Sequence, residues 1–579
     1  MFLIKEKRKH GTYLCIVQSY RDPDTKKTKK RRIKNIGYLE DLQKEYDDPI
    51  AYFQQVAKEM SEEYSIKKTP IPLALDPTKK LESEDNMVKN FGYAALSAVY
   101  YELKLDDFFR GRQRALDIHY SLNSVMKLLV YGRILFPGSE KQIYRKKDRF
   151  FDKMEFSLDD LYSSFPYLHR YKSQLQKWIH ERICENYGRD TRKLYYYVTN
   201  HYFELDEQEL QHASKEQRHD PTLQMGLFVD TNHLPVSYEL FQRTPGDIPL
   251  LTPVFKKARE DYGVERVIVV VDNGVNSAHH LYRIAAGGNG YIVSQSIRSA
   301  EKEIKDYVLN PEGYVPLGNE RRMKSRLCTR KIRITTAEGK KKTVCLKEKQ
   351  IIFHDAVYAR WAIAERENVL MKAKDLIASP GRYNKSSAYG VSNYIKNIEY
   401  DNKTGEILQD KQSQSLALDE ERLREEESFD GYYMIYTSEL EMPDAEVIYN
   451  YSDIWEIQDA FTFVNESFLA KPDFVLRSDH APAHFSTCFI ALTLTRILQM
   501  KTQWKYPLHR IVKSFKKCTC VRIEDNYYIQ TYYDSVLATI GDSTGIDFEK
   551  KYRPLCQIKE QLKKNKSVEN TLSGNKASC

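Results

Sequence analysis

Alternating apolar and polar positions mark the start of the chain. Residues 1–40 contain two such runs, GTYLCIVQSY and KRRIKNIGYL, around the turn-like segment RDPDTKK. Period-two alternation around a polar turn predicts a β-hairpin. A helical pattern follows over 42–66, and residues 67–89 are rich in proline and charge. We therefore expect a small basic β/α unit over 1–66, followed by a linker over 67–89.

Between residues 90 and 192, apolar residues recur every three to four positions, which predicts helices. The clearest ones read ALSAVYYELKLDDFF, SLNSVMKLLVYGRILF and SQLQKWIHERICENY, with the basic loop FPGSEKQIYRKKDRF among them. A helical region with basic loops can hold a helix-turn-helix that binds DNA. Plain packing of helices explains the same pattern equally well.

At residue 193 the pattern changes to short apolar runs. Strand-like KLYYYVT, MGLFVD and LPVSYELF precede the amphipathic LLTPVFKKAREDYG, the buried strand ERVIVVVD, the helical SAHHLYRIAAG and the strand NGYIVSQS. Three strands, a helix, a strand, a helix and a strand predict an α/β core with a mixed sheet. We assign residues 193–298 to the first part of this core.

Residues 299–429 interrupt the α/β order and are too numerous for a loop. They include strand-like KIRITTA and KTVCLKEKQIIFH and the helical ARWAIAERENVLMKAKDLI, so we expect a β-rich insertion subdomain. The core pattern resumes over 430–503, with a strand, a helix over about 443–468 and the very apolar run HFSTCFIALTLTRILQM. Residues 504–579 form a C-terminal region with a basic tail.

The net charge of +9 is concentrated in two places. Residues 1–35 contain twelve Lys/Arg and three Asp/Glu, which equals the whole net charge, and residues 319–349 have the same two counts. A single basic run is usually a solvated surface. Two such blocks with interleaved β-forming residues favour nucleic acid as the partner, because each neutralised phosphate releases counterions.

Composition narrows the class of protein further. A content of 41% hydrophobic and 12% aromatic residues indicates a globular chain. No apolar run reaches the roughly 18–20 residues of a membrane span, and the segment MFLIKEKRKHGTYLC lacks a signal-peptide apolar region. Cys518 and Cys520 form C-x-C rather than the C-x-x-C of zinc sites. We expect a cytoplasmic, nucleoid-associated protein without a membrane partner.

Candidate chemistry begins at Asp272, which ends the buried strand ERVIVVVD. The carboxyl ends of strands are where α/β folds build sites. One acid cannot hold a pair of metal ions, so the residues near Asp272 decide what the site can do.

The chain resembles bacterial insertion-sequence transposases of the DDE class, in the large "IS-four" superfamily with a β-rich insertion. The resemblance covers nearly the whole chain and rests on the segments MFLIKEKRKHGTYLCIVQSYRD, LYYYVTNHYFE, QMGLFVDTNHLPVSYELF, RVIVVVDNGVNS, ESFDGYYMIYTSEL, YSDIWEIQDAF and the helix from His484. It implies an RNase H-like core, double-stranded DNA of the transposon terminal repeats as partner, and a homodimer. It also implies three carboxylates that hold two Mg²⁺ ions, which activate a hydroxyl for attack on phosphodiesters.

Carried over residue by residue, the resemblance predicts a degenerate catalytic triad. The family's first acid lies on the first strand, where this chain has Tyr197. The second acid is kept as Asp272, which is the one metal ligand carried over, and the glutamate position is Gln458. Two Mg²⁺ ions require anionic oxygen ligands, so a neutral phenol and a neutral amide remove two of the three charges.

The family's Tyr-x2-Arg-x3-Glu-x6-Lys signature, which contacts transposon-end DNA, is also altered. Tyr451 is kept, whereas Ile454 and Asn465 replace the arginine and the lysine. Trp455 could stack on an extruded base or pack in an amphipathic helix, and packing is the favoured interpretation. His484 matches a family position at the head of the last helix, where we expect a structural cap.

Four hypotheses of function stay open, and the last of them is a decaying element copy that has no function. The first is a transposase that binds DNA but has lost cleavage and strand transfer. The second is an active, Mg²⁺-dependent enzyme that uses substitute carboxylates, with Asp230, Glu456 and Asp459 as candidates. The third is a non-enzymatic DNA-binding regulator derived from a transposase. The predicted fold is α/β, with an RNase H-like mixed-sheet core, a β-rich insertion, a small basic β unit and a helical DNA-binding region.

Overall fold

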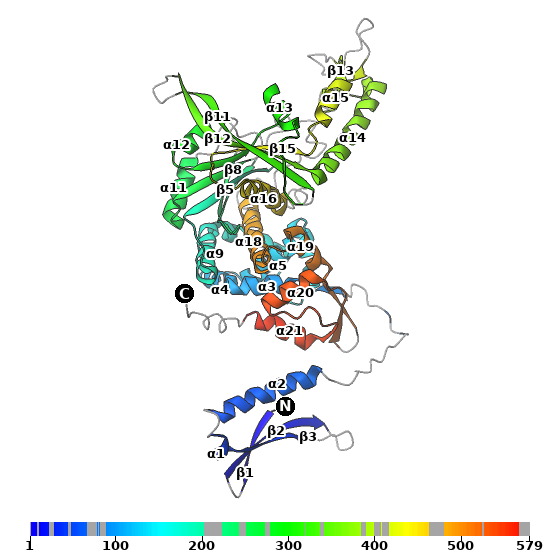
Figure 1. Ribbon diagram of the computed structural model, residues 1–579. Helices are drawn as coiled ribbons and strands as arrows, with labels where there is room; N and C mark the ends of the chain where they lie inside the picture. The colour runs from blue at the N-terminus through cyan, green and yellow to red at the C-terminus, as the bar shows by residue number, and fades with distance from the viewer. Residues whose placement is uncertain are drawn as a thin grey trace. The chain divides into compact units, whose positions relative to one another are not determined.

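The computed structural model in Figure 1 divides into two compact units, Met1–Glu82 and Ser83–Cys579. It describes residues 2–8, 11–21, 28–43, 48–66, 78, 80, 88–201, 223–242, 251–271, 278–318, 320–335, 341–383, 390–398, 407, 416–462, 480–523 and 526–566.

The first unit is a three-stranded antiparallel sheet followed by two helices. Its elements are β1 (Phe2–Arg8), β2 (Gly11–Arg21), β3 (Thr28–Tyr38), α1 (Leu39–Leu42) and α2 (Pro49–Ile66). Strands β2 and β3 form the hairpin that the alternation predicts, and β1 adds a third strand on the other side of β2. The four consecutive residues Leu14–Val17 of β2 are buried, as are Phe53 and Ala57 of α2. The central strand is therefore covered on both faces.

The predicted helical region is helical throughout. Its helices are α3 (Tyr93–Glu102), α4 (Leu105–Gln113), α5 (Leu122–Leu135), α6 (Glu140–Tyr144), α7 (Leu158–Ser163), α8 (Phe165–Arg170) and α9 (Lys172–Tyr187). Local sequence sets several boundaries, because Ser121, Ser139 and Ser157 cap the starts of α5, α6 and α7 through their side chains. Gly188 ends α9 with a φ of 67°, the left-handed conformation that glycine adopts without strain.

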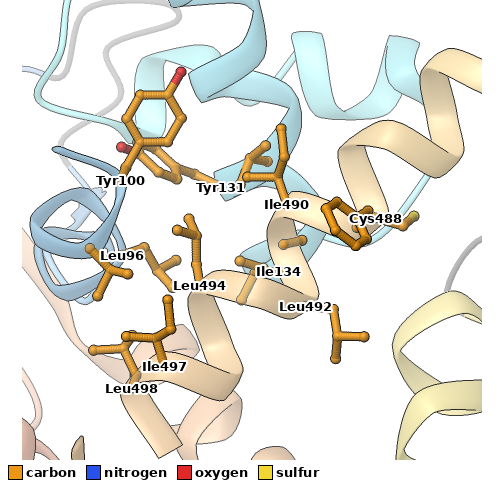
Figure 2. Close-up of a cluster of buried hydrophobic side chains, with 14 of the residues drawn as sticks. Leu96, Tyr100, Tyr131, Ile134, Cys488, Ile490, Leu492, Leu494, Ile497 and Leu498 are labelled. Carbon is orange, nitrogen blue, oxygen red and sulfur yellow. The ribbon is translucent and has the colours of Figure 1, made fainter. Parts of the chain in front are cut away.

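One long helix packs against much of the helical region. Helix α18 (His480–Lys501) contacts α3, α5 and α8. Figure 2 shows Ile490, Leu494 and Ile497 of α18 packed near Leu96 of α3 and Tyr131 of α5. The helical region and the sheet therefore share one hydrophobic core.

The central sheet has nine strands in the order β10-β11-β12-β15-β9-β8-β5-β6-β7. Strand β5 is parallel to β8, and β8 is parallel to β9, whereas the other pairs are antiparallel. The fold is thus mixed α/β with a large mixed sheet. The strands are β5 (Lys193–His201), β6 (Leu223–Val229), β7 (Pro235–Gln242), β8 (Arg266–Val271), β9 (Gly290–Ser294), β10 (Val315–Pro316), β11 (Arg321–Thr335), β12 (Lys341–Asp355) and β15 (Tyr432–Thr437).

Helices cover both faces of this sheet, which explains why its middle strands read as continuous apolar runs. Helices α11 (Leu251–Tyr262) and α12 (Ala278–Ala286) pack on one face. Helices α16 (Asp444–Thr462) and α18 pack on the other. The order from β5 to β9 agrees with the strands and helices that the sequence predicts.

The long strands of the predicted insertion belong to the central sheet. Strands β11 and β12 pair along all 15 residues of each, and β12 also pairs with β15. The rest of this segment contains α13 (Lys302–Leu309), α14 (Ala356–Ala378), β13 (Ile395–Lys396), β14 (Ala417–Leu418) and α15 (Glu420–Glu427). Ala373, Leu376, Val391 and Ile395 form a separate small core there.

The C-terminal region closes a second, four-stranded sheet. Its order is β18-β17-β16-β4, so β4 (Val88–Asn90) returns from the other end of the unit to pair with β16. The elements of the region are α19 (Leu508–Lys517), β16 (Thr519–Arg522), β17 (Tyr527–Gln530), α20 (Ser535–Thr544), β18 (Tyr552–Pro554) and α21 (Leu555–Lys564).

Of the helices in the described ranges, none has the length and apolar character needed to cross a bilayer.

Candidate active site

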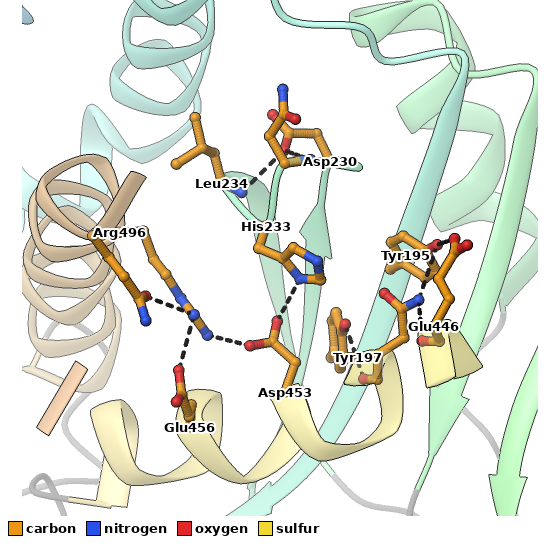
Figure 3. Close-up of polar contacts among 12 residues, drawn as sticks. Tyr195, Tyr197, Asp230, His233, Leu234, Glu446, Asp453, Glu456 and Arg496 are labelled. Atoms are coloured by element: carbon orange, nitrogen blue, oxygen red, sulfur yellow. Dashed lines mark hydrogen bonds and ion pairs between the residues drawn. The ribbon is translucent and has the colours of Figure 1, made fainter. Parts of the chain in front are cut away.

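Tyr197, at the predicted first acid position, lies in the middle of β5 and faces α16. Its side chain is fully buried, and its hydroxyl donates a hydrogen bond to the main-chain oxygen of Asn450, 3.2 Å away (Figure 3). Burial raises the pKa of this phenol well above its usual value, and the nearby Asp453 carboxylate raises it further. Tyr197 is therefore a neutral packing residue with a satisfied hydroxyl.

Of the other two predicted acid positions, 272 and 458, the structure describes only the main chain of 458. Strand β8 runs parallel beside β5, with Tyr197 paired to Val270, and β8 ends at Val271. Asp272 and Asn465 lie outside the described residues. Gln458 belongs to α16, but its side chain is also outside what the structure describes. The structure thus brings position 197 to the helix that carries position 458.

Two signature residues of α16 are core residues. Tyr451 and Ile454 are buried in the cluster that α16 shares with the sheet. The arginine position of the family signature is therefore occupied by an aliphatic side chain that points into the protein interior. Tyr451 and Ile454 therefore pack α16 against the sheet.

Trp455 lies in an aromatic cluster at the wall of a cleft. Its ring contacts those of Tyr358, Tyr433 and Tyr451, with centroids 6.3, 5.4 and 5.6 Å away. The cleft has a volume of about 820 Å³, and Arg298 also lines it. Trp455 therefore packs, as favoured from the sequence, and also borders open space.

A buried charge network lies beside Tyr197 and was not foreseen from the sequence. Asp453 of α16 accepts a hydrogen bond from Arg496 of α18, and His233 Nδ1 lies 3.1 Å from its other oxygen. Arg496 also contacts Glu456 at 3.0 Å (Figure 3). Burial alone would raise the pKa of Asp453, but the charge of Arg496 and the contact with His233 lower it. The sequence signal for such a pair is Arg496, which lies within the apolar run of α18, because a buried charge needs a partner of opposite charge.

The substitute carboxylates have structural partners. Asp230 forms a fully buried ion pair with Arg189 at 2.7 Å, and its other oxygen accepts hydrogen bonds from the main chain of Asn232 and Leu234. Glu456 is paired with Arg496. The side chain of Asp459 lies outside the described residues. Asp230 therefore holds the β6–β7 turn, and Glu456 balances a buried cation.

The described residues do not fit a two-Mg²⁺ centre. Within the described ranges, no group of three or more His, Cys, Asp or Glu side chains could hold a metal ion. The position predicted to supply the first ligand holds a protonated phenol whose hydroxyl is bound to a carbonyl. Hard divalent cations require anionic oxygen ligands, which this group does not offer.

His484 joins α18 to the helical region. Its Nδ1 lies 3.0 Å from both Glu140 Oε1 and Arg133 Nη2, and its Nε2 lies 3.4 Å from Cys488 Sγ. Burial, with the charge of Arg133, lowers the pKa of His484 to about 4. Burial also raises the pKa of the Cys488 thiol to about 12, which excludes a reactive thiolate. This cluster is structural, but the expectation that His484 caps the helix is wrong, because α18 begins at His480 and His484 lies within it.

Comparison with known proteins gives one family. No curated protein matches the chain. Residues 3–70 match the model of the IS1634 family transposase, N-terminal domain. The match covers the three strands and both helices of the first unit. It supports the identification of the chain as an insertion-sequence transposase.

Proposed function

We propose that the chain is a DDE-type transposase derivative that binds the double-stranded DNA of transposon ends and does not cleave it. The observation that carries the proposal is the buried, hydrogen-bonded side chain of Tyr197, at the position to which the resemblance assigns the first catalytic acid. The family match at residues 3–70 supports the transposase origin.

The topology of the sheet supports an RNase H-like core. Strands β5, β6 and β7 are antiparallel neighbours, and β8 and β9 continue on the other side of β5 in parallel. The resemblance places the first acid on the first strand of the core and the second acid on the fourth. In this chain the first and fourth strands, β5 and β8, are adjacent, which is the arrangement that such a pair of acids needs.

The loss of cleavage follows from charge. In relatives, bound Mg²⁺ supplies the activation of the attacking hydroxyl. Here the buried phenol of Tyr197 cannot replace a carboxylate, and the nearby acids Asp453 and Glu456 already neutralise Arg496. Freeing Asp453 for a metal would break its fully buried pair with Arg496, which is strongly unfavourable. The second hypothesis, an active enzyme with substitute acids, therefore lacks a source of ligands among the described residues.

Retained DNA binding is supported by the basic segments. Lys30, Arg31 and Lys34 of β3 are exposed on the first unit. Strands β11 and β12 carry most of the second basic block and pair with each other in the central sheet. Dimer formation at paired DNA ends and association with the nucleoid belong to the same proposal by analogy with the family.

The test is binding and cleavage by the full chain on duplexes that span the DNA flanking its own reading frame. We expect binding with EDTA present and no nicking or strand transfer with Mg²⁺ or Mn²⁺. Metal-dependent strand transfer by the unaltered chain would overturn the proposal.

A restoration series tests the cause of inactivity. Tyr197→Asp with Gln458→Glu, with and without Ile454→Arg and Asn465→Lys, restores the family pattern. Tyr197→Phe with Gln458→Glu is the matched control, because it leaves position 197 neutral. Cleavage that appears only in the Asp-containing variants would identify the missing acid as the cause.

A further inference from the structure

The antiparallel pair β11–β12, called the ribbon below, has two chemically different faces. Residues paired across the two strands share a face, and the register pairs Thr329 with Lys347 and Arg333 with Thr343. The even-numbered residues form the inner face, where Ile332, Ile334 and Leu346 are buried in the cluster that includes α11 and α12. The odd-numbered residues form the opposite face, which we call the outer face.

Three cations on the inner face are used inside the protein. Arg330 donates to the buried carboxylate of Glu348 at 2.6 Å. Arg326 donates to Gln350 at 2.6 Å, and Lys324 donates to the main-chain oxygen of Asn310 at 2.6 Å. Each of these side chains has a structural function that accounts for its presence.

Three cations on the outer face have no such function. Lys331, Arg333 and Lys347 are exposed, and they form no hydrogen bond or ion pair with any residue that the structure describes. Each faces a small neutral side chain across the ribbon: Cys345, Thr343 and Thr329 respectively. From Ser325 to Arg333 and from Thr343 to Lys349, the outer face contains no acid. Leu327, on the same face, is 70% exposed.

We propose that the outer face of the ribbon binds duplex DNA, with Lys331, Arg333 and Lys347 on phosphates and Thr329 and Thr343 toward the bases. This inference rests on the proposed function, because it assigns a surface to DNA binding. Cations at alternate positions of one strand lie about 6.6–6.8 Å apart, and a two-stranded ribbon fits the major groove of B-DNA. Helix α12 packs against β11 behind the inner face, and a preformed surface loses less conformational entropy on binding than one that must first fold.

One end of the outer face lies next to helix α16 of the candidate active site. Ser325 and Lys349, at its inner end, both contact Asp444 at the start of α16, and the Lys349 Nζ to Asp444 Oδ1 distance is 2.9 Å. Helix α16 carries Asn450, Asp453 and position 458. DNA held on the outer face therefore extends toward the helix where the resemblance places the third acid.

Cys345 provides a direct probe, because its thiol is exposed in the middle of the outer face. Cys556, on α21, is also exposed and serves as the internal control. The full chain is alkylated with a maleimide, alone and with a saturating duplex, and each site is quantified by mass spectrometry. We expect the duplex to slow labelling of Cys345 at least fivefold and to leave Cys556 unchanged. Equal labelling of Cys345 with DNA bound would overturn the inference.

A charge-matched pair of variants gives a second readout. Lys331→Gln with Lys347→Gln removes two charges from the outer face. Lys256→Gln with Arg259→Gln removes two exposed charges from α11, on the opposite face of the same sheet. Affinity falls as salt rises, and each lost phosphate contact makes the slope of log affinity against log salt less steep by about 0.9. We expect a slope that is less steep by about 2 for the ribbon variant only.

The outcomes separate the two proposals. Binding that is insensitive to the ribbon variant overturns the surface assignment and leaves the proposed function standing. If the full chain binds no duplex DNA, both fail. Equal loss of slope in both variants would also overturn the assignment, because it would show that only overall charge matters.

Discussion

The hydroxyl of Tyr197 and the main-chain oxygen of Asn450 are joined by a 3.2 Å hydrogen bond between strand β5 and helix α16. The residue that we propose to occupy the first acid position thus ties the sheet to the helix that carries the proposed glutamate position. Tyr197 has a structural function, and this function can be measured.

Removal of the two neighbouring tyrosine hydroxyls should have opposite consequences. Tyr197→Phe loses a buried hydrogen bond and should lower the free energy of unfolding by about 0.5–1.5 kcal/mol. The hydroxyl of Tyr196 is buried without a hydrogen-bond partner among the described residues. Tyr196→Phe should therefore leave stability unchanged or raise it. Urea unfolding of both variants checks the pair, and equal losses would contradict the assigned contacts.

Tyr197→Asp should cost considerably more than Tyr197→Phe. The substitution leaves a cavity in a fully buried position and places a carboxylate near the charge of Asp453. Loss of a buried aromatic ring alone costs about 3–5 kcal/mol. Unfolding measurements on this variant show whether the restoration series has folded protein to test. A loss below about 1 kcal/mol would mean that the position is open to water.

Arg496 should be among the most sensitive residues of the chain. Arg496→Met leaves Asp453 buried without its cation, which should lower the free energy of unfolding by about 3–5 kcal/mol. Arg424→Met is the control, because the Arg424–Glu420 pair on α15 is exposed and such pairs contribute roughly 0–1 kcal/mol. Similar effects in the two variants would show that the network is accessible to solvent.

His484 should make stability depend on pH. Its pKa of about 4 in the folded protein lies below its ordinary value of 6.5, so the unfolded chain takes up this proton first. The contribution of His484 is therefore complete above pH 6.5 and is lost as the pH falls toward 4, by roughly 3 kcal/mol in all.

The variant His484→Gln should flatten this decline, whereas His509→Gln on the exposed face of α19 should not. Denaturation midpoints measured from pH 7.5 to pH 4.5 test both. An unchanged slope for His484→Gln would contradict the buried neutral imidazole.

Local patterns predict the strands of the core because burial on both faces leaves a continuous apolar run, as in residues 266–271. They do not predict that β12 joins this sheet, because the pairing of Ile351 with Ile435 connects distant parts of the chain. The Asp453–Arg496 pair was missed for the same reason. Residue types did identify position 197 as neutral, but its bond to Asn450 depends on how α16 lies on the sheet.

The chain leaves the central sheet after Asp355 and returns to it at Gly431, and the main-chain nitrogen of the first donates to the oxygen of the second at 2.9 Å. The intervening segment has its own small core. Because its two ends meet, changes in its length cost the sheet little, only about 0.6 kcal/mol for each doubling of a flexible connection. This junction is therefore a natural point for module exchange, where evolution or an engineer can replace one folded segment with another while the strand register stays intact.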